Sequence, residues 1–274
     1  MREASAQSRN DPMAGQAWSG RTGTSFFSEG ERVPALLYRP EACFARAPAI
    51  IVSPSRVTPI EEMSWLAEPL VAAGYTVLVH AYRPGLRYQI RDVADVRNAV
   101  SWVIESADGD PDRIAVIGHS RGASAALRAA GEDSRIRSAI ALSCPTNIAR
   151  YMDGLRNHSP SRFATLVNGY GGIPEDDLTY YRQISPLFHA ARISAPVLLI
   201  HGIDDMVAPK ENSEWMQGAL RESGNSNVRL ALIAEAGHFF EHRFDGYLFD
   251  PVLKVIGQWL EETLAARPSV ERRQ

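Results

Sequence analysis

The chain reads Ile114-Ala115-Val116-Ile117-Gly118-His119-Ser120-Arg121-Gly122-Ala123-Ser124-Ala125-Ala126-Leu127 at the point that decides its fold. An apolar, strand-like run leads into a G-x-S-x-G motif, and a helix-like run follows it. Such a motif on a strand-to-helix turn is a nucleophile elbow, in which strained backbone exposes the serine hydroxyl at the tip of the strand. Glycines flank the serine because a side chain there would crowd the turn. The motif predicts Ser120 as a nucleophile and the Arg121 backbone N–H as an oxyanion donor.

Short apolar runs alternate with helix-like stretches on both sides of this motif. The runs are Ile50–Val52, Thr76–Val79, Ile114–Ile117, Ala139–Leu142, Val197–Ile200 and Val228–Ile233. Strings that are apolar on both faces are typical of strands buried in a parallel sheet. Two further strands, Thr24–Phe27 and Val33–Tyr38, are separated by turn residues and predict an antiparallel hairpin. The order predicts an α/β fold with a mostly parallel sheet of six plus two strands, eight in all, flanked by helices.

The chain has 274 residues, enough for one α/β domain with a sizeable core. We predict a flexible lead-in at residues 1–20, the domain at residues 21–266 and a solvated tail at residues 267–274. More than 50 residues rich in Pro and Gly separate Leu142 from Pro196, far more than a crossover needs. They predict an insertion at about residues 145–190, after the sixth strand, that caps the site. Its aromatic residues either line a substrate cleft or hold the insertion together, and they are Tyr151, Phe163, Tyr170, Tyr180 and Tyr181.

The composition argues against several classes of partner. A net charge of -3 gives no reason to expect nucleic acid or an anionic membrane. Two cysteines, Cys43 in a loop and Cys144 at the end of a strand, make no disulfide framework, and no cluster of metal ligands is visible. The polar N-terminus, residues 1–20, has no apolar core of signal-peptide length, and no window of the chain approaches the 18 apolar residues of a membrane span. We expect a cytoplasmic protein with a small-molecule substrate and no metal, either monomeric or a homodimer.

A serine nucleophile needs a base, and the base needs an orienting carboxylate. In an elbow fold the carboxylate follows the serine along the chain, and the histidine comes last. Asp204 and Asp205 follow the strand Val197–Ile200, and His238 follows the strand Val228–Ile233 after a short loop. Because parallel strands end at the same edge of a sheet, we expect these side chains to lie beside the elbow.

Four stretches together carry a family resemblance. They are Asp112–Gly122, Ser185-Pro186-Leu187, Ala195–Pro209 and Gly237-His238-Phe239-Phe240. On these stretches the chain resembles the α/β-hydrolases, and most closely the catalytic domain of the prolyl oligopeptidase and dienelactone hydrolase group, from about residue 33 to residue 265. The resemblance implies an α/β-hydrolase fold, no metal or organic cofactor, Ser120 as nucleophile and His238 as general base. In similar sequences the carboxylate stands three residues before the valine of a D-x-x-V stretch, which implies Asp204 and leaves Asp205 as the alternative.

The other six of the seven histidines are weaker candidates for the base. Three precede the aspartates, one lies inside the elbow and one ends a strand; they are His80, His158, His189, His119 and His201. His242, four residues after His238, is the remaining rival.

The second oxyanion donor in similar proteins comes from the loop after the strand Ile50–Val52, where they often carry His-Gly. This chain has Ser53-Pro54-Ser55-Arg56-Val57-Thr58-Pro59 there instead. Pro54 has no N–H, so the donor is Ser55 or Arg56, and the alignment of strand ends favours Arg56. The Arg56 side chain either clamps a substrate carboxylate or points to solvent.

Tyr82-Arg83-Pro84-Gly85 stands where relatives often have Tyr-Arg-Gly. Tyr82 and Arg83, with His119 from the elbow, are therefore candidate substrate contacts, and Arg83 could alternatively brace the oxyanion loop. Arg56, Arg83 and Arg121 together would make the pocket mouth electropositive, which favours an anionic substrate.

The leading hypothesis is a serine hydrolase that cleaves a small-molecule ester, thioester or lactone through an acyl-enzyme on Ser120. Similar proteins that cleave peptides usually carry an N-terminal β-propeller, which the roughly 30 residues before the hydrolase region are too few to form. An amidase or small-peptide acyl hydrolase with the same triad is one alternative. A non-catalytic ligand-binding protein on a hydrolase scaffold is another.

Overall fold

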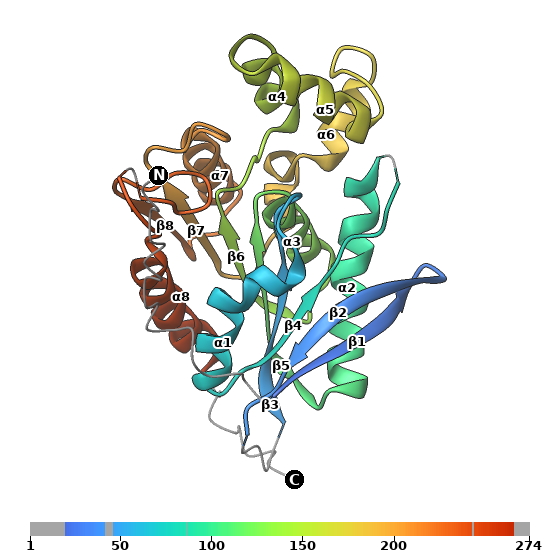
Figure 1. The fold of residues 1–274 in the computed structure, drawn as a ribbon, viewed down its shortest axis with the longest axis vertical. Helices are drawn as coiled ribbons and strands as arrows, with labels where there is room; N and C mark the ends of the chain where they lie inside the picture. Colours follow the sequence, from blue (N-terminus) through green and yellow to red (C-terminus); the bar gives the residue numbers. More distant parts are fainter. Residues whose placement is uncertain (1–19, 42–45, 86, 243, 266–274) are drawn as a thin grey trace, which may run out of the picture.

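A computed structural model describes residues 20–41, 46–85, 87–242 and 244–265. Its centre is one sheet of eight strands in the order β1-β2-β4-β3-β5-β6-β7-β8 (Figure 1). The strands are β1 (Arg21–Ser28), β2 (Glu31–Tyr38), β3 (Ala47–Ser53), β4 (Thr76–His80), β5 (Gly109–His119), β6 (Ile136–Leu142), β7 (Val197–Gly202) and β8 (Val228–Ile233). β1 pairs with β2 and β2 with β4 in antiparallel fashion, and the other neighbours are parallel. The predicted hairpin and fold class are confirmed. The predicted lead-in, Cys43 and the predicted tail lie outside the described residues, except for residue 20.

The inner strands are apolar because helices cover both faces of the sheet. Every side chain of β4 and all but one of β3 are buried. β8 is only partly buried, as expected of a strand at the edge. Cys144 is fully buried just after β6, and burial raises the pKa of its thiol to about 12.

Two layers of helices enclose the sheet. The helices of the main domain are η1 (Ile60–Met63), α1 (Ser64–Ala72), α2 (Tyr88–Ser106), α3 (Arg121–Glu132), α7 (Glu211–Glu222) and α8 (Phe249–Leu264). One apolar core joins α1 and α8 to one face of the sheet, and a second joins α2, α3 and α7 to the other face. The strands thus become a rigid platform whose ends can hold side chains in place.

An insertion separates β6 from β7, as predicted. It comprises α4 (Ile148–His158), α5 (Pro160–Tyr170), α6 (Leu178–Ile184) and η2 (Pro186–Arg192). Figure 1 shows α4, α5 and α6 together at one end of the molecule, beyond the sheet. They have a small core of their own, in which Tyr170, Tyr180 and Tyr181 are buried. These three tyrosines therefore hold the insertion together.

The parallel strands end level with one another, and this alignment creates the site. Ser53 of β3 is opposite Gly118 of β5, and His119 of β5 is opposite Leu142 of β6. The loops after β3, β5, β7 and β8 therefore leave the same edge of the sheet, where α/β proteins place their ligands.

Candidate active site

Ser120 forms the turn between β5 and α3. Its backbone has φ 54° and ψ -111°, a conformation that residues other than glycine rarely adopt. The flanking glycines allow this turn, since a Cβ on Gly118 would lie 2.1 Å from the Gly122 carbonyl oxygen, and a Cβ on Gly122 would lie 2.1 Å from the Ser53 carbonyl oxygen. The strain presents the partly exposed Ser120 hydroxyl at the edge of the sheet.

His238 links this serine to a carboxylate. Its Nε2 lies 3.0 Å from Ser120 Oγ, and its Nδ1 lies 2.7 Å from Asp205 Oδ2. His238 is 3% exposed, so the hydrogen-bonded chain is largely shielded from water. Within this chain a neutral His238 donates from Nδ1 and keeps Nε2 as the acceptor for the serine proton. The rival His242 contacts Glu235 instead, at 3.3 Å.

The choice of Asp204 from the sequence is corrected by this geometry. Asp204 is exposed, and its backbone N–H donates to the Ala236 carbonyl. Asp205 turns inward, where its Oδ1 accepts hydrogen bonds from the Val207 and Ala208 amides, both at 2.8 Å. This Asx-type turn is the signal that the sequence analysis missed, because it aims Oδ2 of Asp205 at His238.

His201, at the end of β7, is a further member of the network. Its Nε2 lies 2.7 Å from the Ala208 carbonyl and 3.1 Å from Asp205 Oδ2, and its Nδ1 lies 2.7 Å from Ser213 Oγ. Because both partners of Nε2 only accept, Nε2 donates and the serine hydroxyl donates to Nδ1. Burial alone would raise the pKa of Asp205, but hydrogen bonds from His201 and His238 outweigh it and hold this pKa below its usual range.

His119 is buried and hydrogen-bonded within the protein, which argues against its assignment as a substrate contact. It is 5% exposed and its Nε2 donates to the His238 carbonyl at 2.8 Å. Burial, reinforced by the neighbouring His238 ring, lowers the pKa of His119 to about 3. The neutral ring therefore holds the backbone of the histidine loop.

We expect His119→Gln to reduce the pH dependence of stability. With a folded-state pKa of about 3 against an ordinary 6.5, the unfolded chain binds a proton in this range that the folded protein excludes. The His119 contribution to the free energy of unfolding is thus unimpaired above pH 6.5 and falls by about 1.4 kcal/mol per pH unit as the pH drops toward 3. Glutamine does not titrate and can donate to the same carbonyl. In urea unfolding at pH 7 and pH 5, wild type should lose about 2 kcal/mol more than the variant; equal losses would contradict this.

The oxyanion loop after β3 has a compact hydrogen-bonded shape. The Ser55 hydroxyl pairs with Thr58 Oγ1 at 2.6 Å and accepts from the Val57 and Thr58 amides. Among the described residues, neither the Ser55 nor the Arg56 amide has a hydrogen-bond acceptor. Both amides thus remain candidates for the second donor, beside the Arg121 amide at the start of α3. The Arg56 side chain is exposed.

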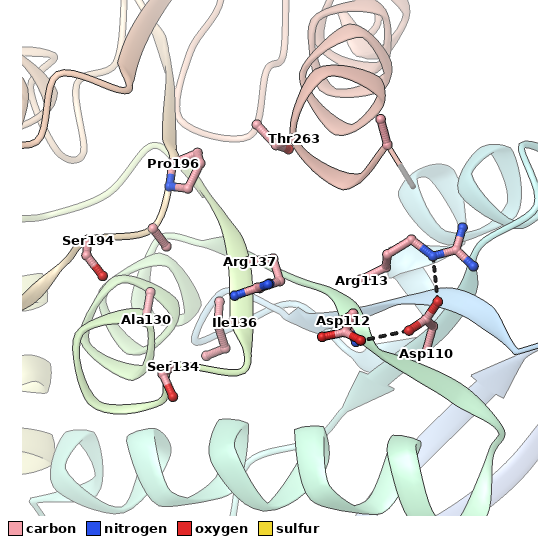
Figure 2. Close-up of a pocket in the computed structure, with 12 residues that line it drawn as sticks. Asp110, Asp112, Arg113, Ala130, Ser134, Ile136, Arg137, Ser194, Pro196 and Thr263 are labelled. Atoms are coloured by element: carbon pink, nitrogen blue, oxygen red, sulfur yellow. Dashed lines mark hydrogen bonds and ion pairs between the residues drawn. The ribbon is translucent and has the colours of Figure 1, made fainter. Parts of the chain in front are cut away.

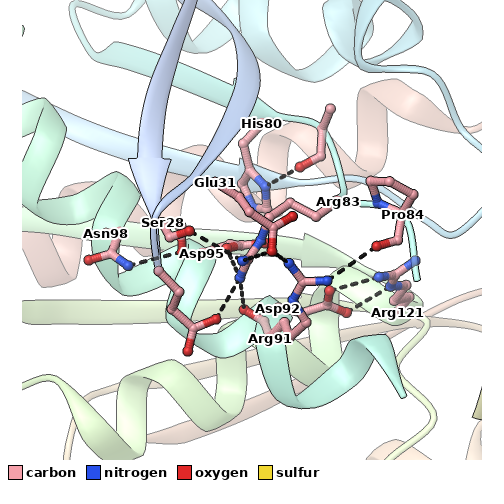
Figure 3. Close-up of polar contacts among 12 residues, drawn as sticks. Ser28, Glu31, His80, Arg83, Pro84, Arg91, Asp92, Asp95, Asn98 and Arg121 are labelled. Atoms are coloured by element: carbon pink, nitrogen blue, oxygen red, sulfur yellow. Dashed lines mark hydrogen bonds and ion pairs between the residues drawn. The ribbon is translucent and has the colours of Figure 1, made fainter. Parts of the chain in front are cut away.

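The predicted electropositive mouth is not formed. Arg83 is 5% exposed and binds Asp95 at 2.7 Å and Glu29 at 2.9 Å, so it joins the β1–β2 turn to α2 and does not contact substrate (Figure 3). The Arg121 side chain makes two hydrogen bonds of 2.7 Å to Asp92. Within the described residues, only Arg56 of the three arginines has no carboxylate partner. The paired side chains of Arg83 and Arg121 therefore give no reason to expect an anionic substrate.

Tyr82 lies between the elbow and the oxyanion loop. Its hydroxyl donates to the Pro54 carbonyl at 2.6 Å, and the Arg121 guanidinium lies 3.7 Å from the centre of its ring. Both the hydroxyl and the ring of Tyr82, which the sequence suggested as a substrate contact, are thus engaged in contacts within the protein.

Two of the cavities lined by described residues lie at opposite edges of the sheet. One of about 680 Å³ lies where β5, β6 and β7 begin, with Asp110, Arg113 and Arg137 among its lining residues (Figure 2). It is about 20 Å along β5 from Ser120, too far to join the triad. The other, of about 520 Å³, is bordered by Asp205, by charged side chains that include Arg150, Lys210 and Glu211, and by apolar side chains. The latter are Tyr151 and Leu155 of α4, Ile203, Met206 and Val207 of the loop after β7, and Trp215 of α7.

No group of three or more His, Cys, Asp and Glu side chains in the described part of the chain is arranged to hold a metal ion. Within the same residues, no helix combines the length and apolar character needed to cross a membrane.

Comparison with known proteins identifies relatives of this chain. Acylamino-acid-releasing enzyme 1 of Oryza sativa subsp. japonica is 28% identical over 201 residues, covering 66% of this chain and 26% of that enzyme. Esterase LipC of Mycobacterium tuberculosis is 26% identical over 228 residues, covering 72% of this chain and 53% of that protein. The chain thus spans about a quarter and about half of the lengths of these two relatives.

The fold has counterparts among solved structures. Acylaminoacyl peptidase of Pyrococcus horikoshii superposes with a TM-score of 0.76 at 18% identity, over 91% of this chain and 42% of that chain. The sequence profile of the prolyl oligopeptidase family matches residues 63–263, a stretch that holds the elbow, Asp205 and His238. Because this match takes in well over half of the sequence, the chain belongs to the prolyl oligopeptidase family.

Proposed function

We propose that this protein is a serine hydrolase that works through an acyl-enzyme on Ser120. The observation that carries the proposal is the unbroken hydrogen-bonded chain from Ser120 through His238 to Asp205, on a strained elbow. A serine hydroxyl is a weak nucleophile unless a base is within hydrogen-bond reach, and here that base is held in place by a buried carboxylate.

Acylation follows from the direction of these hydrogen bonds. Ser120 Oγ attacks the substrate carbonyl carbon while its proton passes to His238 Nε2, and the carbonyl π electrons move onto oxygen. The oxyanion is stabilised by the Arg121 amide and by an amide of the loop after β3. Asp205, held ionised, stabilises the imidazolium that forms. When the tetrahedral intermediate collapses, the bond to the leaving group breaks and His238 Nε2 returns the proton to it.

Deacylation uses the same groups in reverse. Water attacks the ester carbonyl of the acyl-enzyme as His238 Nε2 takes one water proton. The second tetrahedral intermediate then releases the carboxylic acid, and the proton returns to Ser120 Oγ. The reaction sequence thus balances with groups of the chain and one water molecule.

For the substrate we propose a small-molecule carboxylic ester, thioester or lactone. The pocket beside Asp205 has apolar and aromatic side chains such as Tyr151, Leu155 and Trp215 beside charged ones such as Arg150 and Lys210, and its apolar part suits an uncharged organic group. The similarity to a protein named esterase LipC supports ester cleavage. We place the protein in the cytoplasm, because two cysteines, one of them fully buried, provide no disulfide framework of the kind found in secreted domains.

A second candidate is release of an N-acylated amino acid from an amide or short peptide. It is favoured by the similarity to acylamino-acid-releasing enzyme 1 over 66% of this chain. The same triad serves both reactions, but an amide has a poorer leaving group, so protonation by His238 matters more.

A fluorophosphonate probe tests the proposed function directly. We expect one adduct, located on Ser120 by peptide mass spectrometry, and no adduct in His238→Ala. Rates on p-nitrophenyl acetate and on N-acetylalanine p-nitroanilide then separate the two candidates. Absence of labelling in the wild-type protein would exclude an activated serine and favour a ligand-binding role.

A further inference from the structure

The loop after β3 is pressed against the start of α3. A Cβ on Gly122 would lie 2.1 Å from the Ser53 carbonyl oxygen and 2.6 Å from that of Pro54. The loop therefore passes beside the elbow at van der Waals distance. A small shift of this loop would move its amides relative to the Arg121 amide, so its position has to be held by side chains.

Tyr82 holds one peptide unit of this loop. Its hydroxyl donates to the Pro54 carbonyl at 2.6 Å, a short hydrogen bond for a neutral donor and acceptor. The Pro54 carbonyl and the Ser55 N–H belong to the same planar peptide unit. Fixing the carbonyl therefore fixes the direction of the Ser55 N–H, and only the Ser55 backbone separates it from the Arg56 N–H.

The Arg121 side chain fixes Tyr82 in turn. Its guanidinium lies 3.7 Å from the centre of the Tyr82 ring. Two hydrogen bonds of 2.7 Å join the same guanidinium to both oxygens of Asp92 on α2 (Figure 3). The side chains of Arg121 and Asp92 are 9% and 3% exposed. A planar cation held by a bidentate pair and shielded from water makes a strong contact with an aromatic face.

His80 makes a second contact with the Tyr82 ring. The His80 ring meets the Tyr82 ring edge-on at 5.7 Å, and His80 Nε2 accepts from the Ser53 hydroxyl at 2.7 Å. The Tyr82 ring thus contacts a cation that belongs to α3 and an imidazole that belongs to β4.

We propose that Tyr82 and the Arg121 side chain are positioning residues for the oxyanion hole. This inference rests on the proposed serine hydrolase function. Arg121 then has two roles: its backbone amide is one oxyanion donor, and its side chain, acting through Tyr82, sets the place of the loop that provides the other. The Ser-Pro-Ser-Arg loop thereby gains from side chains the fixed geometry that catalysis requires.

Tyr82→Phe is the variant that tests this role, because it removes only the hydroxyl and leaves the ring between Arg121 and His80. We expect kcat on p-nitrophenyl acetate to fall about tenfold or more while KM stays within twofold, since a displaced donor affects the transition state more than the bound ester. The Ki of a trifluoromethyl ketone, whose adduct with Ser120 carries an oxyanion, should rise by the same factor.

Tyr181→Phe is the matched control. The Tyr181 hydroxyl also donates to a backbone carbonyl, that of Gly172, at 2.8 Å, but inside the insertion. We expect Tyr181→Phe to lower Tm by about as much as Tyr82→Phe does, and to leave kcat and Ki unchanged. If Tyr82→Phe behaves in the same way as Tyr181→Phe, the positioning role is overturned.

Arg121→Gln tests whether the guanidinium acts through Tyr82. It should raise the Ki in the wild-type background and have a much smaller effect in the Tyr82→Phe background, because the hydrogen bond it supports is already absent. If Arg121→Gln raises Ki equally in both backgrounds, the inference that the guanidinium acts through Tyr82 is overturned. A wild-type protein that takes up neither fluorophosphonate nor the ketone at Ser120 overturns the hydrolase proposal and this one together. Normal labelling with an unchanged Tyr82→Phe overturns the positioning role alone.

Discussion

Replacing Ser120 with alanine is expected to lower kcat on p-nitrophenyl esters by about 10⁶. The substitution removes the atom that forms the acyl-enzyme, and no other hydroxyl takes its place in contact with His238 Nε2 among the described residues. Residual activity would come from a water molecule in the same pocket, assisted by the oxyanion donors. Steady-state rates and burst kinetics measure the loss, and a variant within tenfold of wild type would contradict the proposed nucleophile.

Ser120→Gly separates the loss of the nucleophilic hydroxyl from the relief of backbone strain at residue 120. It should be as inactive as the alanine variant but more stable by about 1–2 kcal/mol, because glycine adopts φ 54° and ψ -111° without steric cost whereas a Cβ does not. Urea unfolding of the two variants gives the comparison. Equal stability would mean that the elbow carries no backbone strain.

The order of elements could be predicted because burial on both faces leaves a clear pattern. Runs such as Ile50–Val52 and Val197–Ile200 have no polar face, so they fit only strands between two layers of helices. The insertion could be predicted from length alone. Its internal packing could not be predicted, since tyrosines such as Tyr180 and Tyr181 occur both in the lining of clefts and in cores, and the sequence does not show their neighbours.

The nucleophile could be predicted from the sequence because its chemistry requires a local motif. The glycines around Ser120 are required because a Cβ at either position would lie 2.1 Å from a backbone carbonyl oxygen, and this requirement is visible in the sequence as G-x-S-x-G. The roles of Arg83 and Arg121 could not be predicted in this way, because no local motif marks them. Arg83 and Arg121 are neutralised by Asp95 and Asp92, whose burial on α2 depends on tertiary packing and leaves no mark at neighbouring positions.

The carboxylate was misassigned because Asp204 and Asp205 differ by a single step along a loop. Spacing to Val207 favoured Asp204, but side-chain direction in a loop is set by hydrogen bonds and not by periodicity. The Asp205 carboxylate closes a turn through the Val207 and Ala208 amides, and this turn selects it.

Asp205→Asn is expected to lower kcat by about 10⁴ while leaving the fold intact. The orientation of the new amide is determined by its surroundings. Asp205 Oδ1 accepts from two backbone N–H groups, so the asparagine must place its carbonyl oxygen there and turn its NH₂ toward His238 Nδ1. An N–H donor facing Nδ1 forces His238 to carry its proton on Nε2.

The wrong tautomer explains the size of the effect. With a proton on Nε2, His238 donates to Ser120 Oγ and cannot accept the serine proton. Asp204→Asn is the matched control, since Asp204 is exposed and its side chain lies outside the network; its kcat should stay within twofold of wild type. A larger loss in Asp204→Asn than in Asp205→Asn would return the carboxylate role to Asp204. The fluorophosphonate labelling rate provides a second readout, because it requires the same proton transfer from Ser120 to His238 and should fall in Asp205→Asn alone.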